Sequence, residues 1–264
     1  MMRQGVLPFR ARTSESAADL DPSCDPYCHH PGLRDRIAPP LASFFRTFQP
    51  STFDAQVIAA GGDTDWRYAD HSREAMRAAT LAGRLDRDLW VFAYGSLMWD
   101  PAFCFAEVRR GAITGFARRF ILLDTYGARG SREEPGLMVA LDHGDGCQGL
   151  AFRIAGRDVA AETEILWRRE LLGPAYLPAF VTVTTDFGPV EALTVVANHA
   201  SPVIRPDLSR AEQVQYIATG RGMLGSSREY IENIAGQCAA LELHDPELSG
   251  LLAEVRAWPG RPQC

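Results

Sequence analysis

A glycine and a serine interrupt the most apolar stretch of the chain, WVFAYGSLMWDP at residues 90–101. Glycine allows the backbone to approach a ligand closely or to adopt a positive φ. Successive exposed N–H groups at such a turn form a concavity that binds a carboxylate or a developing oxyanion. The turn Tyr94, Gly95, Ser96 and Leu97 is therefore a candidate binding surface made of backbone. The structural alternative is an ordinary turn that ends a strand.

A carboxylate close to a tryptophan is the second chemical feature. Trp167 and Glu170 belong to the sequence WRRE, within a predicted helix over residues 158–171. Residues three apart share a helix face, so a core position for Trp167 would place Glu170 at an apolar boundary. Such a boundary raises a glutamate pKa from about 4.3 and suits a general base. The alternative is a rim glutamate paired with a neighbouring arginine.

Two arginine pairs, Arg109-Arg110 and Arg118-Arg119, could contact an anionic substrate. Strand alternation predicts that Arg118 and Arg119 point to opposite faces of a sheet. One of them could then face a ligand, although surface positions are commoner for arginine.

Metal binding has weak support. Cys24, Cys28, His29 and His30 have the side-chain types of zinc ligands. No second pair follows at the spacing of a structural zinc site, so a solvated loop is favoured and no metal is predicted.

Nucleophilic catalysis also has weak support. Ser96 does not lie in a G-x-S-x-G elbow. His143 and His199 fall in or near predicted turns, and Cys104 and Cys147 lie in strand-like apolar stretches where inert buried thiols are expected. The chain contains no lysine, which excludes Schiff-base, pyridoxal-phosphate and P-loop lysine chemistry.

The elements that must position these residues form an α+β pattern. Short β-rich stretches with Gly-containing turns come first, and helices are inserted between them and follow them. This predicts a mostly antiparallel β-barrel or sheet with surrounding and C-terminal helices. The first predicted strand ends just before Gly95. The later ones are 107–122, 136–146 and 147–155, with a hairpin at 178–198. The helices after 158–171 are 209–222, capped by Ser209, then 226–242, and 245–258, capped by Asp245.

The composition divides the chain into three parts. Residues 1–88 are punctuated by Pro, Ser, Asp and Gly, which predicts a partly disordered extension with a short helix in 41–48 and a longer one near 70–88. Asp70 or Ser72 is the expected cap of the longer helix. Residues 89–259 form the main domain, and 260–264 are a tail.

Charge and composition limit the partners. The 264 residues carry a formal net charge of −6, which argues against nonspecific nucleic-acid binding and against anionic membranes. The six cysteines are scattered, and neither a signal peptide nor a membrane span is visible, so a cytoplasmic location is expected. The sequence leaves the oligomeric state open.

Several motifs in order resemble the glutathione-specific ChaC-type γ-glutamylcyclotransferases. WVFAYGSLMWDP resembles the opening of that family, and GAITGFARRF, PGLMVALDHGDGCQGLAFRI, LWRREL and GSSREYIENI resemble its later segments, over about residues 89–258. The resemblance implies a γ-glutamylcyclotransferase-like fold and Glu170 as the catalytic acid/base. It implies a substrate-binding surface formed by Val91, Phe92, Ala93, Tyr94, Gly95, Ser96 and Leu97, with Tyr230 as a weaker candidate.

The chemistry implied by the resemblance is intramolecular and needs no cofactor. The α-amino group of a γ-glutamyl unit attacks its own γ-carbonyl, which forms 5-oxoproline and releases cysteinylglycine from glutathione. The Gly95 turn would bind either the oxyanion or the α-carboxylate. The family often has glycine in place of Ala93 and an aromatic-rich loop with histidine where this chain has ILLDTYGARGSREE. The alternatives are another γ-glutamyl substrate, a non-catalytic binding module, and, more distantly, a serine hydrolase using Ser96.

Overall fold

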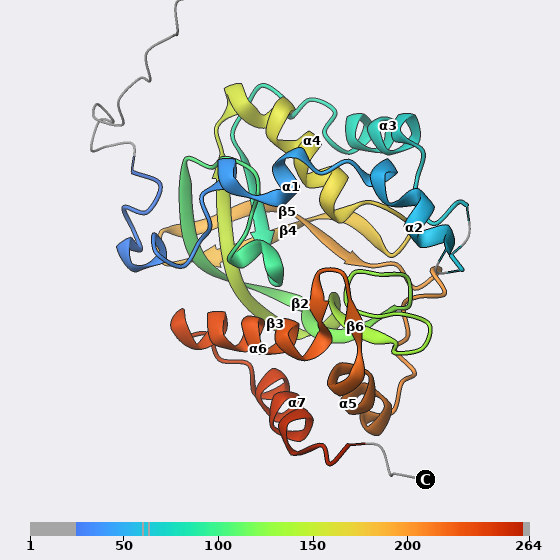
Figure 1. Ribbon diagram of the computed structural model, residues 1–264. Coiled ribbons are helices and arrows are strands. Elements are labelled where there is room, and N and C mark those ends of the chain that lie inside the picture. The colour runs from blue at the N-terminus through green and yellow to red at the C-terminus, as the bar shows by residue number, and fades with distance from the viewer. Residues whose placement is uncertain (1–24, 60, 63, 261–264) are drawn as a thin grey trace, which may run out of the picture.

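A closed five-stranded β-barrel forms the centre of the computed structural model, which describes residues 25–260 except 60 and 63 (Figure 1). The strand order is β1-β3-β2-β4-β5, and only the closing pair β1–β5 is parallel, through Trp90 opposite Ala192 and Val91 opposite Leu193. The predicted α+β class is therefore confirmed. The strands are β1 Leu89–Ala93, β2 Glu107–Asp124, β3 Gly136–Ile154, β4 Tyr176–Thr185 and β5 Gly188–Ala197.

The prediction of two strands at 136–146 and 147–155 is wrong, because β3 is continuous over both. The glycines interpreted as a turn allow close strand contact instead: a Cβ on Gly144 would lie 2.5 Å from the Cβ of Ala117 on β2. The bend is carried by β2, where the register with β3 shifts between Thr114 and Phe116 and Gly115 has a φ of 80°. His143, expected near a turn, consequently lies within β3.

The helices lie on two sides of the barrel (Figure 1). Helix α4, Val159–Glu170, lies on one side, and α5 Arg210–Thr219, α6 Ser227–Ala240 and α7 Pro246–Ala257 lie on the other. The predicted Ser209 and Asp245 caps are confirmed, since their side chains accept hydrogen bonds from the amides of Glu212 and Leu248. The predicted helix 209–222 ends earlier, and a small hairpin of β6 Arg221–Gly222 and β7 Gly225–Ser226 follows.

Helices, three of which begin at a proline, make up much of the described part of the extension, including a short helix within 41–48 as predicted. They are η2 Pro31–Leu33, η3 Pro40–Ala42, α1 Phe44–Thr47, η4 Pro50–Phe53, α2 Asp54–Ala59 and α3 Asp70–Thr80.

The expected helix over 70–88 differs from the structure at both ends. Ala69 is the N-cap of α3 and makes no side-chain cap, while Asp70 lies in the first turn and pairs with Arg73 at 2.9 Å. The helix ends at Thr80, and Gly83 then adopts a φ of 69°, which favours glycine over other residues. Leu81 is nevertheless fully buried, so the chain after α3 still packs on the core.

A salt bridge anchors the extension to the domain. Arg46 pairs with both carboxylate oxygens of Glu162 on α4, and the amide of Cys104 donates to the same carboxylate over 2.7 Å. The sequence analysis expects Cys104 in a strand, but it lies in the loop between η5, Ser96–Met98, and β2.

Replacing Arg46 by alanine is expected to lower the free energy of unfolding by about 2–3 kcal/mol, because Glu162 stays buried without its cation. The midpoint of urea denaturation measures this. Arg34→Ala is the matched control, since Arg34 forms an exposed pair with Asp25 and its loss is expected to cost about 0.5 kcal/mol or less. Equal midpoints for the two variants would contradict the prediction.

None of the helices in the described part of the chain has the length and apolar character needed to cross a membrane.

Candidate active site

The turn after β1 brings backbone close to two other elements. Gly95 has a φ of −128°, so positive φ is not the reason for glycine here. A Cβ at this position would lie 3.0 Å from Val139 on β3 and 3.3 Å from the Tyr230 hydroxyl on α6. Close approach is therefore the property that glycine supplies.

The hydrogen bonds that close the turn are made by other amides than the three that are predicted to bind substrate. Its hydrogen bonds run from the amides of Met98 to the Gly95 carbonyl, over 2.9 Å, and from those of Trp99 and Asp100 to the Ser96 carbonyl. None of these bonds uses the amide of Gly95, Ser96 or Leu97.

The strand before the turn is held rigidly. Val91, Phe92 and Ala93 are buried and pair with β3, which places the first two in the core rather than among polar groups. Thr194 donates from its hydroxyl to the Phe92 carbonyl over 3.0 Å. These residues therefore support the turn, and direct substrate contact by their side chains stays a prediction.

Glu170 is the last residue of α4, and its side chain is only 16% exposed. Burial raises the pKa of its carboxyl, the Arg169 guanidinium opposes that shift, and nearby Asp100 adds to it. The Arg169 Nε donates to Glu170 Oε1 over 2.8 Å. Glu170 therefore has the features of both hypotheses. Burial raises the pKa of its carboxyl, and a neighbouring arginine pairs with it.

Arg169, which the sequence analysis did not single out, connects Glu170 to the turn. Its Nη2 donates to the Ser96 hydroxyl over 2.9 Å, and its Nη1 donates to the Asp100 carbonyl. An arginine cannot take a proton from Ser96, so this contact gives no support to Ser96 as a nucleophile.

Three tyrosines surround the carboxylate from different elements: Tyr94 after β1, Tyr176 on β4 and Tyr230 on α6. Burial raises the pKa of all three phenols, and Glu170 contributes to the shift of each. They are therefore neutral hydrogen-bond donors at physiological pH. Tyr176, which the sequence analysis missed, donates to the Val139 carbonyl over 2.7 Å.

The loop between β2 and β3 adds a cation that the sequence analysis also missed. Asp124 organises this loop by accepting hydrogen bonds from four of its amides, those of Tyr126, Gly127, Arg129 and Gly130. The Arg129 guanidinium carbon lies 5.2 Å from the centre of the Tyr230 ring. The segment ILLDTYGARG, noted as a departure from the family, therefore supplies a positive charge at the site.

Of the two arginine pairs, Arg118 reaches the turn, where it binds a backbone carbonyl. Arg118 is buried, as strand alternation predicts for one of the pair, but its guanidinium donates to the Tyr94 and Gln148 carbonyls and pairs with Asp245. Arg119 is exposed. Arg109 donates to the Glu107 carboxylate over 2.5 Å, and Arg110 donates to the Leu241 carbonyl over 3.1 Å.

The candidate metal ligands and thiols are not assembled either. His29 pairs with Glu107 over 3.0 Å and His30 accepts from the Arg110 amide, while Cys24 lies outside the described residues. Within the described ranges, no group of three or more His, Cys, Asp or Glu side chains could hold a metal ion. Burial raises the pKa of Cys147 to about 11, in agreement with an inert thiol.

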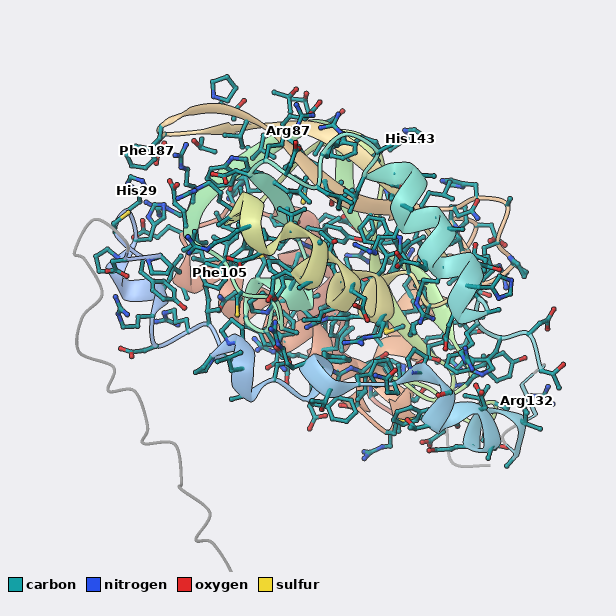
Figure 2. All side chains as sticks on the ribbon, turned by 90° about the horizontal axis from the view of Figure 1, so that it is seen from above. His29, Arg87, Phe105, Arg132, His143 and Phe187 are labelled. Carbon is teal, nitrogen blue, oxygen red and sulfur yellow. The ribbon has the colours of Figure 1, made fainter. Side chains whose placement is uncertain are left out.

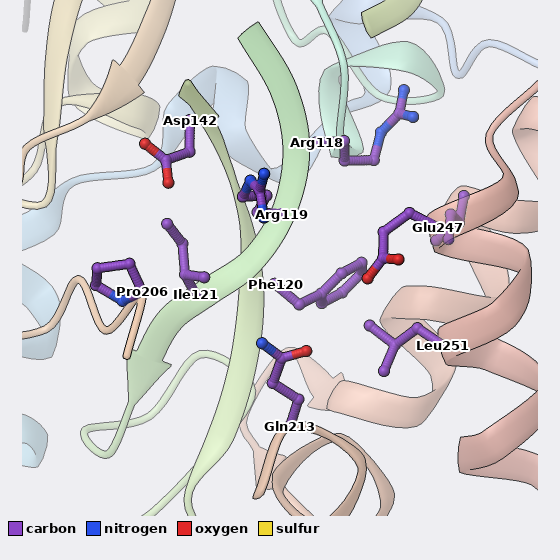
Figure 3. Close-up of a pocket in the computed structure, with 10 residues that line it drawn as sticks. Arg118, Arg119, Phe120, Ile121, Asp142, Pro206, Gln213, Glu247 and Leu251 are labelled. Carbon is purple, nitrogen blue, oxygen red and sulfur yellow. The ribbon is translucent and has the colours of Figure 1, made fainter. Parts of the chain in front are cut away.

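A cavity of about 60 Å³ between β2 and the C-terminal helices is separate from the site (Figure 3). Phe120, Glu247 and Leu251 line it, and Glu170 and Gly95 do not. It is far smaller than the roughly 300 Å³ at which small-molecule sites begin.

Comparisons with known proteins identify a family and relatives of this chain. The family model described as ChaC-like protein matches residues 89–258. A glutathione-specific gamma-glutamylcyclotransferase of Escherichia coli (strain K12) is 34% identical over 191 residues, which cover 72% of this chain and 82% of that protein. Glutathione-specific gamma-glutamylcyclotransferase 1 of Homo sapiens is 33% identical over 176 residues, or 63% of this chain and 78% of that protein.

A solved structure shares the fold. The crystal structure of a glutathione-specific γ-glutamyl cyclotransferase from yeast matches with a TM-score of 0.60 and 20% identity, over 65% of this chain and 96% of that one.

Proposed function

Because the chain belongs to the ChaC-like family, we propose that it is a γ-glutamylcyclotransferase that cleaves glutathione into 5-oxoproline and cysteinylglycine. The observation that carries the proposal is the buried carboxylate of Glu170, tied through Arg169 to the backbone turn at Gly95 and Ser96. One acid/base beside a backbone surface is sufficient for a reaction in which the substrate supplies its own nucleophile.

The proton balance assigns both transfers to Glu170. Its carboxylate takes a proton from the α-ammonium of the glutamyl unit, and the freed amine attacks the γ-carbonyl carbon. A C–N bond forms and the carbonyl oxygen becomes an oxyanion. The oxyanion then collapses and the bond from the γ-carbon to the cysteine nitrogen breaks, while the protonated Glu170 gives its proton to that nitrogen. The ring nitrogen loses its second proton to the released amine, so that cysteinylglycine leaves as its ammonium and Glu170 is again a carboxylate. Acid–base catalysis of this kind contributes roughly 10²- to 10⁴-fold.

The remaining groups hold the substrate. We assign the amides of Gly95, Ser96 and Leu97 to the oxyanion or the α-carboxylate, and the Arg129 cation to a substrate carboxylate. Neutral Tyr94 and Tyr230 offer further hydrogen bonds. Fixing the amine against the carbonyl supplies on the order of 7 kcal/mol of the barrier reduction.

The pH profile is the expected sign of the buried base. Turnover needs the ionised form of Glu170, so kcat should fall toward acid with a midpoint above the ordinary glutamate pKa of about 4.3. In Asp100→Asn the midpoint should move to lower pH, because Asp100 raises the pKa of Glu170. Initial rates with glutathione over a pH series measure the midpoints of the wild type and of Asp100→Asn. Equal midpoints for the two proteins would contradict the prediction.

Product analysis tests the function itself. Purified protein is incubated with glutathione, and 5-oxoproline and cysteinylglycine are followed by mass spectrometry. A panel of other γ-glutamyl dipeptides and γ-glutamyl amines runs alongside, because a preference for one of them would replace glutathione as the substrate. Glutathione binding without product would favour a non-catalytic binding module.

A further inference from the structure

The extension crosses the end of α4 that carries Glu170. We define the strap as residues 43–68 without 60 and 63, which lie outside the part of the chain matched by the family model. The strap contacts α4 and its exit at three points: the Arg168 Nη2 donates to the Arg46 carbonyl over 3.1 Å, the Phe45 ring lies on Arg169, and the Tyr68 amide donates to the Leu172 carbonyl over 2.7 Å. In Figure 1 this segment runs from α1 to α2 across the barrel side occupied by α4.

The contact on Arg169 is the one closest to the chemistry. The edges of the Arg169 guanidinium donate to Glu170, to Ser96 and to the Asp100 carbonyl. One of its faces is covered by Phe45, whose ring centre lies 4.2 Å from the guanidinium carbon. The Arg169 side chain is consequently only 3% exposed. Each of the three guanidinium nitrogens donates a hydrogen bond, so water reaches the cation mainly through its two faces, and Phe45 covers one of them.

We propose that Phe45 is a positioning residue, which keeps water from Arg169 and thereby holds Glu170 in the geometry and ionisation needed for proton transfer. The inference rests on the proposed function. It gives the extension a part in the reaction through the contact of one aromatic ring with Arg169.

The strap is built so that Phe45 has little freedom. The Ser43 hydroxyl caps α1 by accepting from the Phe45 amide over 3.1 Å. Arg46, next in the chain, is fixed by Glu162. Further along, Arg67 donates two hydrogen bonds to the Asp54 carboxylate, from Nε to Oδ1 over 2.8 Å and from Nη2 to Oδ2 over 2.7 Å.

The far end of the strap is held by the β2–β3 loop. Arg132 of that loop donates to the Gly61 carbonyl, and Figure 2 shows Arg132 beside α2. The strap therefore joins α4 to the loop that carries Arg129.

The ionisation of Glu170 depends on few neighbours. Two charged groups shift its pKa, Arg169 on α4 and Asp100 after η5. Glu170 in turn raises the pKa of three phenols that come from other elements, Tyr94 after β1, Tyr176 on β4 and Tyr230 on α6. Among the described residues, Arg169 is the one cation paired with it. If water reaches Arg169, its attraction for the carboxylate is screened, and the pKa of Glu170 rises.

The test compares Phe45→Ala with Phe45→Tyr and with Phe44→Ala. Phe44 lies on the same short helix and is 54% exposed, so its removal takes away a phenyl ring of equal size from the strap. We expect Phe45→Ala to lower kcat for glutathione about tenfold and to shift the acid limb to higher pH, with KM changed less than about twofold. Phe45→Tyr keeps the aromatic face and should restore both, while Phe44→Ala should resemble the wild type.

A second readout needs no substrate. Carbon NMR of protein labelled at glutamate carboxyls follows the titration of Glu170, whose signal is assigned by its loss in Glu170→Gln. Phe45→Ala should move this titration to higher pH and Phe44→Ala should not. An unchanged titration in Phe45→Ala, or an equal shift in Phe44→Ala, would overturn the proposal. A wild type that turns over no glutathione, with the NMR shift still present, would defeat the proposed function and leave the positioning of Glu170 standing.

Discussion

Glu170→Gln is expected to lower kcat with glutathione by at least about a hundredfold, and up to about 10⁴-fold, without loss of the fold. Glutamine has almost the same shape and its carbonyl oxygen can still accept from Arg169 Nε, which reaches Glu170 Oε1 over 2.8 Å in the structure. It cannot take the proton from the substrate ammonium. The measurement is single-turnover formation of 5-oxoproline, followed by mass spectrometry.

Glu164→Gln is the matched control for that variant. Glu164 lies on the same helix, and its pair with Arg168 is exposed, with 56% of the Glu164 side chain accessible. This control should keep wild-type turnover. Equal product from Glu170→Gln and the wild type would retain the reaction and remove Glu170 from its role.

Gly95→Ala is the second variant with a large expected effect, a loss of about a hundredfold in kcat/KM. The added methyl group would lie 3.0 Å from Val139 and 3.3 Å from the Tyr230 hydroxyl, so the turn or its neighbours must shift. The displaced groups are the backbone and the phenol proposed to hold the substrate. Steady-state kinetics with glutathione measures the effect, and the unfolding midpoint shows whether the fold is intact.

Two companion variants separate local crowding from a general effect of alanine. Gly236→Ala on α6 adds a methyl group where nothing lies within 4 Å, so activity should be unchanged. In Gly95→Ala combined with Val139→Ala, the closest contact is removed and part of the activity should return. Failure of the double variant to recover any activity would show that crowding against Val139 is not the cause.

Local patterns predicted the helices best. Ser209 and Asp245 cap their helices through bonds that span only three residues, so the sequence contains the whole interaction. The predictions for the end of α3 and for a break in β3 were wrong because Gly83 and Gly144 have different structural roles. Gly83 adopts a left-handed conformation, whereas Gly144 only makes room for Ala117, and periodicity alone does not separate these uses.

Within the site, prediction depended on how far each contact reaches along the chain. Glu170 and the Gly95 turn could be proposed because each belongs to a short motif. The sequence does not indicate a role for Arg169, although it adjoins Glu170. Its role depends on a hydrogen bond to Ser96, which lies 73 residues away in the chain. The contact of Phe45 with Arg169 joins segments that share no pattern, so it becomes visible only in the folded chain.

The pair between Arg118 and Asp245 has a consequence for how the enzyme is made. Arg118 holds the carbonyl of Tyr94, and its carboxylate partner lies 127 residues later, at the cap of the last helix. A chain still on the ribosome, with Asp245 unmade or inside the exit tunnel, has a buried guanidinium without its counter-charge. The binding turn is therefore completed only after the cap of α7 has been made, and a product truncated before α7 is expected to be inactive rather than partially active.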